Sequence, residues 1–130
     1  MARNPFSHVD LRVRSFPEAV KFYGAFLPLL GFTKFHDFAE WKGWSMPDVP
    51  HPEKPFFGCK LDPDHQPNRT RLAFWAKSRA KVDEIAHALA TVGARNVEGP
   101  MLCEEYSPTY YAIFFEDPSG NLLEVVHRTN

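Results

Sequence analysis

The sequence contains an internal repeat, in which one pattern of strand and helix occurs twice. The first copy opens at His8 and its helix ends at Gly31, while the second opens at Arg71 and its helix ends at Gly93. The copies are offset by 71 − 8 = 63 residues at the strands and 93 − 31 = 62 at the helix ends, close to half of the 130 residues. A period of this kind predicts two copies of one supersecondary unit.

The first copy, or module, is predicted to have the order βαβββ. Alternation of apolar and polar residues indicates an opening strand over 6–13. Ser15 is placed to cap a helix that runs to Leu30, with Gly31 in the left-handed position that follows. Three short strands then complete the module, at 32–38, 41–46 and 56–61.

The second module repeats this order. A strand over 71–76 precedes a helix that Ser78 caps and Gly93 ends. Three further strands are expected, near 95–97, at 110–115 and at 122–127, with a loop over 99–108. The segment Asp117-Pro-Ser-Gly-Asn121 suits a tight hairpin between the last two strands.

Length and composition favour one globular domain over residues 1–130. Hydrophobic residues make up 44% of the chain, which is enough to fill a core. We expect module one at 5–61, a proline-punctuated linker at 62–70 and module two at 71–128.

Charge and cysteine content exclude several classes of partner. Fifteen Lys and Arg against sixteen Asp and Glu, dispersed along the chain, give no electrostatic footprint for nucleic acid or an anionic membrane. Cys59 and Cys103 form neither a disulfide framework nor a zinc ligand set. No apolar run approaches the roughly 18 residues that span a bilayer, and no signal peptide is visible. A cytoplasmic location is therefore expected.

Two stretches carry a recognisable pattern, namely His8-Val-Asp-Leu-Arg-Val13 and Phe115-Glu-Asp-Pro-Ser-Gly-Asn-Leu-Leu-Glu124. They resemble the glyoxalase/bleomycin-resistance/dioxygenase family, the vicinal oxygen chelate superfamily. The resemblance covers essentially the whole chain. It implies an α+β, glyoxalase-like fold in which two βαβββ modules pair into a curved mixed sheet with a central cleft, and a homodimer that binds a small molecule.

In metal-dependent members, the resemblance implies four ligand positions, one at the start of each module's first strand and one on each module's last strand. His8 and Glu124 occupy two of them, and alignment of the modules puts Arg71 and Gly58 at the others. Glycine has no ligating atom, and a guanidinium repels a cation. The metal site is therefore predicted to be degenerate, with either no cofactor or one divalent ion (zinc, nickel, manganese or iron) on His8 and Glu124.

Glu124 needs a compensating partner, because apolar residues surround it and a buried unpaired carboxylate is costly. One interpretation is metal ligation together with His8. The other is an ion pair with Arg71, whose guanidinium would stand where a cation would lie. A third metal ligand would have to come from a loop, and the candidates are His51, His65 and Glu105.

Cationic and aromatic side chains predicted to border the cleft are candidates for substrate binding. They are Arg71, Arg12, Trp75, Lys60, Tyr106 and Tyr110. Such a mixture suits a small anionic or planar molecule, through charge-assisted hydrogen bonds and stacking. The alternative is a salt-bridged polar face or a subunit interface.

Three functions remain open. The favoured hypothesis is a binding protein, similar to the bleomycin-resistance proteins, that holds a small anionic or aromatic molecule. The alternative is a divalent-metal-dependent lyase or isomerase of the glyoxalase type, with His8 and Glu124 as catalytic residues. A metal-free enzyme would use either residue as a general base. A dioxygenase is least favoured, because Arg71 replaces a histidine that iron would need.

Overall fold

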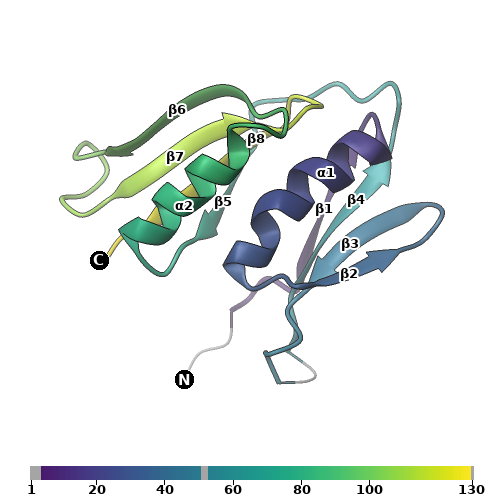
Figure 1. Cartoon of the computed structure of the whole chain (residues 1–130), viewed down its shortest axis with the longest axis horizontal. Helices are drawn as coiled ribbons and strands as arrows, with labels where there is room; N and C mark the ends of the chain where they lie inside the picture. The colour runs from purple at the N-terminus through teal and green to yellow at the C-terminus, as the bar shows by residue number, and fades with distance from the viewer. Residues whose placement is uncertain (1–3, 51–52, 130) are drawn as a thin grey trace. The chain divides into compact units, whose positions relative to one another are not determined.

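The computed structural model describes residues 4–50 and 53–129. The chain divides into two compact units, residues 1–65 and 66–130, so the division falls inside the predicted linker. Each unit contains one βαβββ module (Figure 1).

The first unit is a four-stranded mixed sheet with one helical segment. Its elements are β1 (His8–Val13), α1 (Phe16–Phe26), the 3-10 turn η1 (Leu27–Leu30), β2 (Lys34–Asp37), β3 (Trp41–Ser45) and β4 (Phe56–Leu61). The strand order is β1-β4-β3-β2, with β1 parallel to β4 and the other neighbours antiparallel.

The helical segment of the first unit begins and ends where the local sequence signals predict. The Ser15 hydroxyl accepts a hydrogen bond from the Glu18 backbone N–H at 3.3 Å, and Gly31 ends the helical segment with a φ of 99°. The buried face of α1 packs on the sheet, where the Tyr23 ring lies 4.7 Å from that of Phe57. Apolar burial between α1 and the sheet therefore forms the core of this unit.

The second unit repeats the arrangement. Its elements are β5 (Arg71–Trp75), α2 (Arg79–Leu89), β6 (Arg95–Leu102), β7 (Tyr111–Glu116) and β8 (Leu122–His127), in the sheet order β5-β8-β7-β6. Ser78 caps α2 by accepting from the Lys81 N–H at 3.0 Å. Figure 1 shows α2 lying over β7 and β8, and its residues Val82, Ile85 and Leu89 are buried.

The register of the two sheets confirms the alignment of the modules. His8 begins β1 and Arg71 begins β5. Gly58 and Glu124 are each the third residue of their module's last strand, β4 or β8. The two modules therefore present different residues at equivalent points of the same framework.

Two elements depart from their predictions, since α2 ends at Leu89, short of the predicted end at Gly93, and β6 is longer than predicted. β6 continues to Leu102, where the sequence predicts a loop from Gly99 onward. This strand lies at the edge of its sheet, and its register with β7 shifts on both sides of Glu98. Gly99 has a φ of 94°, and the Gly99-Pro100 peptide is cis. A bulged edge strand accommodates a Gly-Pro pair that would end a regular central strand.

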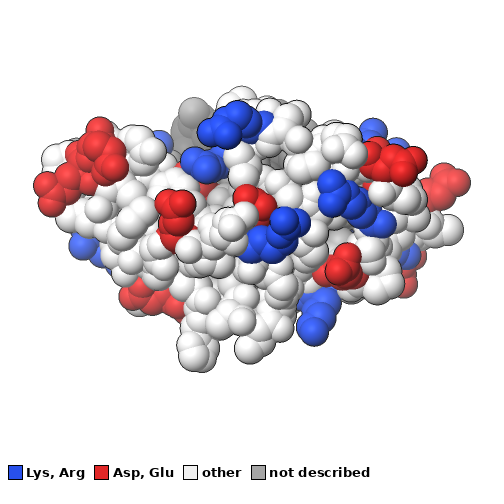
Figure 2. Space-filling view, turned by 90° about the horizontal axis from the view of Figure 1, so that it is seen from above, with Lys and Arg blue, Asp and Glu red and all other residues white. Residues whose placement is uncertain are grey.

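The α+β fold of two βαβββ modules is thus confirmed, while their pairing into one curved sheet with a cleft, as one domain, stays a prediction. Figure 2 shows basic and acidic side chains interspersed over the face in view. None of the helices in the described ranges has the length and apolar character that a membrane span requires.

Candidate functional site

Each sheet has one face packed on its own helix and a second face turned away from it, which we call the far face. Strand alternation places three residues of every six-residue strand on each face. The far face of the first sheet carries His8, Asp10, Arg12, Trp41, Gly43, Ser45, Phe56, Gly58 and Lys60. The far face of the second carries Arg71, Ala73, Trp75, Ala112, Phe114, Leu122, Glu124 and Val126. Most predicted site residues therefore lie on these two faces.

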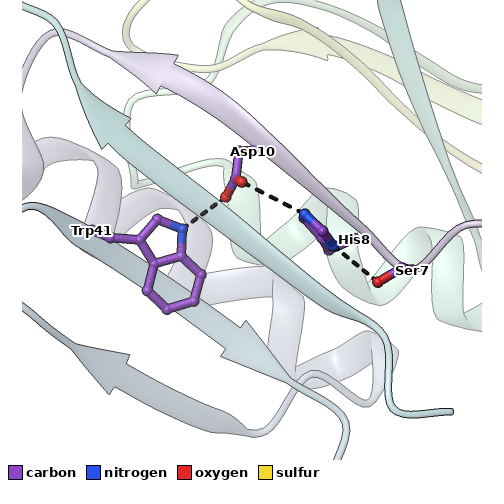
Figure 3. A network of polar contacts seen from close by, with 4 residues as sticks. All are labelled: Ser7, His8, Asp10 and Trp41. Atoms are coloured by element: carbon purple, nitrogen blue, oxygen red, sulfur yellow. Dashed lines mark hydrogen bonds and ion pairs between the residues drawn. The ribbon is translucent and has the colours of Figure 1, made fainter. Parts of the chain in front are cut away.

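A chain of polar contacts crosses the first far face from β1 to β3 (Figure 3). The Nδ1 of His8 lies 2.9 Å from the Ser7 hydroxyl, and its Nε2 lies 3.9 Å from Oδ2 of Asp10. The other oxygen of Asp10 accepts a hydrogen bond from the Trp41 indole N–H at 2.7 Å. The His8 ring stacks on Phe56 with centroids 4.3 Å apart. Both ring nitrogens of His8 thus face protein groups.

Two glycines make room for the Trp41 indole. Gly43 and Gly58 are direct partners on β3 and β4. A Cβ built on either glycine would stand well under 3.0 Å from the indole, and one on Gly58 would also meet Oδ1 of Asp10. The indole therefore covers the backbone of both glycines, which is the close approach that glycine in a strand permits.

Arg12 and Lys60, the two cations of the first unit that were predicted to bind substrate, lie on the same far face. Arg12 and Lys60 are neighbours in register, and Lys60 is also the partner of Trp41. Both side chains are exposed. Positive charge therefore stands beside the indole.

Glu124 is the buried charge of the second unit. It is 5% exposed, and the Tyr110 hydroxyl donates a hydrogen bond to its Oε2. The Tyr106 ring meets the Tyr110 ring edge-on at 5.0 Å. Burial, reinforced by the hydrogen bond to the carboxylate, raises the pKa of Tyr110 above its ordinary value. Tyr110 is thus held neutral as the donor that compensates Glu124.

The predicted ion pair between Arg71 and Glu124 is wrong. The Arg71 guanidinium lies over the Phe114 ring, 5.1 Å from its centroid, and among the described residues it makes no salt bridge to Glu124. In register, Arg71 is opposite Leu122 rather than Glu124. The nearer Tyr110 hydroxyl satisfies the carboxylate instead.

Two predicted aromatic residues of the second unit are largely exposed, Trp75 by 60% and Tyr106 by 61%. The Arg128 guanidinium lies 4.5 Å from the Trp75 ring. Arg128 was missed by sequence reasoning, because a cation just beyond a strand gives no signal of the ring it covers.

Cys103, whose backbone carbonyl accepts a hydrogen bond from the Tyr106 N–H, has a buried side chain. Burial, together with the charges of Glu105 and Glu124, raises the pKa of the Cys103 thiol.

The four positions at which the family resemblance implies metal ligands hold His8, Gly58, Arg71 and Glu124, and glycine and arginine supply no ligating atom for a cation. The indole of Trp41 covers Gly58, and the Arg71 guanidinium lies on Phe114. In the part of the chain that the structure describes, no three His, Cys, Asp or Glu side chains gather as a potential ligand set.

Two of the three loop candidates for a third ligand lie within the described residues. His51 lies outside the described residues. The His65 backbone carbonyl accepts from Nε of Arg14 at 2.9 Å, and Glu105 is exposed. Sequence reasoning did not predict the contact between Asp10 and Trp41, for which the two glycines in neighbouring strands were the available signal.

The fold and these two faces define a class of proteins built from duplicated βαβββ modules. The model of one family, described as the Glyoxalase/Bleomycin resistance protein/Dioxygenase superfamily, matches residues 6–125. The chain belongs to this superfamily.

Similar proteins agree with this assignment. An uncharacterized protein of Bacillus subtilis, YqjT, is 26% identical over 128 residues, covering 92% of this chain and 95% of its own. A glyoxalase/bleomycin resistance protein from Albidiferax ferrireducens has 25% identity and a TM-score of 0.78, covering 97% of this chain and 100% of its own. A bleomycin-binding protein solved with bleomycin has 17% identity and a TM-score of 0.67, covering 97% and 100%.

Proposed function

We propose that this protein binds a small anionic or aromatic molecule without a metal ion. The observation that carries the proposal is the Trp41 indole over Gly58, at the position where the other module has Glu124. A large ring hydrogen-bonded to Asp10 stands where a metal ligand would be needed. Replacing a ligand by a stacking surface favours binding by contact over binding through a cation.

The second far face supports the same function. Arg71 and Trp75 are exposed, and each takes part in a cation–π pair, with Phe114 and Arg128 respectively. Guanidinium groups ordered on aromatic rings are suited to bind a carboxylate or phosphate with little loss of conformational entropy. We propose Arg71, Trp75, Tyr106 and Tyr110 as ligand contacts here, with Arg12 and Lys60 on the first sheet. The bleomycin-binding protein is a small-molecule binder of the same fold, and it supports the proposal by analogy of fold.

Elemental analysis separates this proposal from a lyase or isomerase that would use His8 and Glu124 with a divalent metal. Tag-free protein is dialysed and measured by inductively coupled plasma mass spectrometry, before and after exposure to nickel, zinc, manganese or iron. We expect far less than one equivalent per chain, and no change in melting temperature on adding EDTA. About one retained equivalent, lost together with stability on chelation, would overturn the proposal.

Ligand binding is tested by melting-temperature shifts with a panel of aromatic and anionic small molecules. A molecule that binds the native state raises the melting temperature in proportion to the logarithm of its concentration. Arg71→Ala and Trp75→Leu should reduce that shift, while Lys21→Met, at an exposed position of α1, should not.

We also propose that the protein is a homodimer, and sedimentation equilibrium tests this oligomeric state.

A further inference from the structure

We propose that the far face of the first sheet is a stacking site for a planar aromatic ring that carries a carboxylate. The ring would lie on the outer face of the Trp41 indole, and the carboxylate would pair with Lys60. This inference rests on the proposed small-molecule binding and names the class of ligand and the place where it binds.

The indole is fixed before any ligand arrives. One of its faces covers Gly43 and Gly58, and its N–H is held by Asp10 at 2.7 Å. The other face is consequently turned away from the backbone of β3 and β4. A half-buried ring that is already ordered loses little entropy on binding, so its stacking energy contributes almost fully to affinity.

Other aromatic rings frame the indole. Phe56 meets it edge-on with centroids 5.7 Å apart, and the 61% exposed Phe38 lies tilted at 6.2 Å. The His36 ring lies at 6.3 Å. A flat ring on Trp41 would therefore contact further rings at its edges, which an alicyclic molecule cannot match.

The charged side chains beside the indole favour a negatively charged ligand. Lys60 is the cross-strand partner of Trp41, and Arg12 is the next residue in register. The Asp10 carboxylate also lies beside the indole, and its Oδ1 accepts the hydrogen bond from the indole N–H. An anionic substituent on the ring would reach Lys60 without displacing that bond.

The experiment is a calorimetric titration of the whole chain with 2-naphthoate. Two comparison molecules separate the contributions, since 2-naphthamide keeps the ring without the charge and cyclohexanecarboxylate keeps the charge without a flat ring. We expect 2-naphthoate to bind most tightly. Trp41→Leu should weaken its binding about tenfold. Lys60→Met should weaken it about threefold and remove most of its salt dependence.

Matched variants control for general effects. Phe35→Leu removes a 42% exposed ring from the opposite face of the same sheet, and Lys21→Met removes a charge from α1. Neither should change the dissociation constant. If Trp41→Leu fails to fold, Trp41→Phe replaces it, because it keeps a smaller ring. We expect Trp41→Phe to bind 2-naphthoate detectably but more weakly than the wild-type protein does.

The outcomes distinguish this inference from the proposed function. No binding of 2-naphthoate, or equal binding of cyclohexanecarboxylate, would overturn the stacking site. Binding that Trp41→Leu leaves intact but Arg71→Ala abolishes would also overturn it, while supporting small-molecule binding on the second unit. One equivalent of retained metal would overturn the proposed function itself.

Discussion

The Trp41 indole lies over Gly58, so the position equivalent to Glu124 in the first module is filled by a ring that belongs to another strand. A side chain at residue 58 would have to displace this ring and break its hydrogen bond to Asp10. Gly58 and Trp41 therefore depend on each other.

Gly58→Ala should destabilise the protein by about 1–3 kcal/mol, because the added methyl group overpacks the site. Urea denaturation followed by circular dichroism measures the free energy of unfolding. Gly24→Ala in α1 is the control, since a Cβ there meets nothing within 4 Å. It should stabilise by about 0.5–1 kcal/mol. Equal effects at the two positions would contradict the packing described here.

Tyr110→Phe should cost about 1–3 kcal/mol, because it leaves the buried Glu124 carboxylate without its donor. Tyr111→Phe is a matched control, since its hydroxyl donates to exposed Asp83, and it should cost less than about 1 kcal/mol. Adding Glu124→Gln to Tyr110→Phe should recover part of the loss, because an amide is cheaper to bury than a carboxylate. A double variant no more stable than Tyr110→Phe would argue against this compensation.

Stability should fall at alkaline pH through Tyr110. Burial and the bond to Glu124 raise its pKa, so the folded state holds the proton after the unfolded state has released it. This contribution to the free energy of unfolding is fully present below the ordinary tyrosine pKa of 10.0 and is lost progressively as pH rises above it. Unfolding free energies between about pH 9 and pH 11 measure the effect. The decline should be shallower in Tyr110→Phe, and parallel curves would refute the assignment.

Arg71→Ala should lower stability by less than about 1 kcal/mol, because it removes only an exposed cation–π contact with Phe114. Breaking a buried ion pair with Glu124 would instead cost about 3–5 kcal/mol. Arg79→Ala removes a similar contact, 5.3 Å from the Tyr111 centroid, and should have a similar small effect. Thermal and urea unfolding of both variants decide between the two accounts of Arg71.

Asp117→Ala should destabilise by about 3 kcal/mol or more, since this buried carboxylate accepts several hydrogen bonds. Its Oδ1 accepts from the N–H groups of Ser119 at 2.8 Å and Asn121 at 3.0 Å, and its Oδ2 accepts from Nδ2 of Asn121 at 2.9 Å. Asp62→Ala removes a single bond from the Asp64 N–H and should cost far less. Similar losses from both variants would show that the hairpin is not specially stabilised.

The regular elements could be predicted because their signals are local. Ser15 and Ser78 cap the helices that follow them directly, and Gly31 adopts the positive φ expected of it. The alignment of Gly58 with Glu124 was also available, because it needs only the order of strands within each copy.

The contacts within the candidate site were less predictable, because they depend on reach across strands. Trp41 covers Gly58 from a neighbouring strand, and sequence spacing does not show which way an indole lies. Glu124 was expected either to ligate a metal with His8 or to pair with Arg71, whereas in the structure the Tyr110 hydroxyl donates a hydrogen bond to it. The sequence therefore indicated that Glu124 needs a partner, but it did not identify Tyr110 as that partner.

The hairpin at Asp117 has a wider consequence for reading related sequences. Its aspartate and asparagine bond to one another and to the turn, and Gly120 has a φ of 88° with Pro67 beside it. In this chain the acidic residue of that motif closes the bend by accepting hydrogen bonds from the backbone N–H groups of Ser119 and Asn121. In this chain the motif therefore specifies the geometry of a turn, and its presence in a sequence indicates this hairpin rather than a particular reaction.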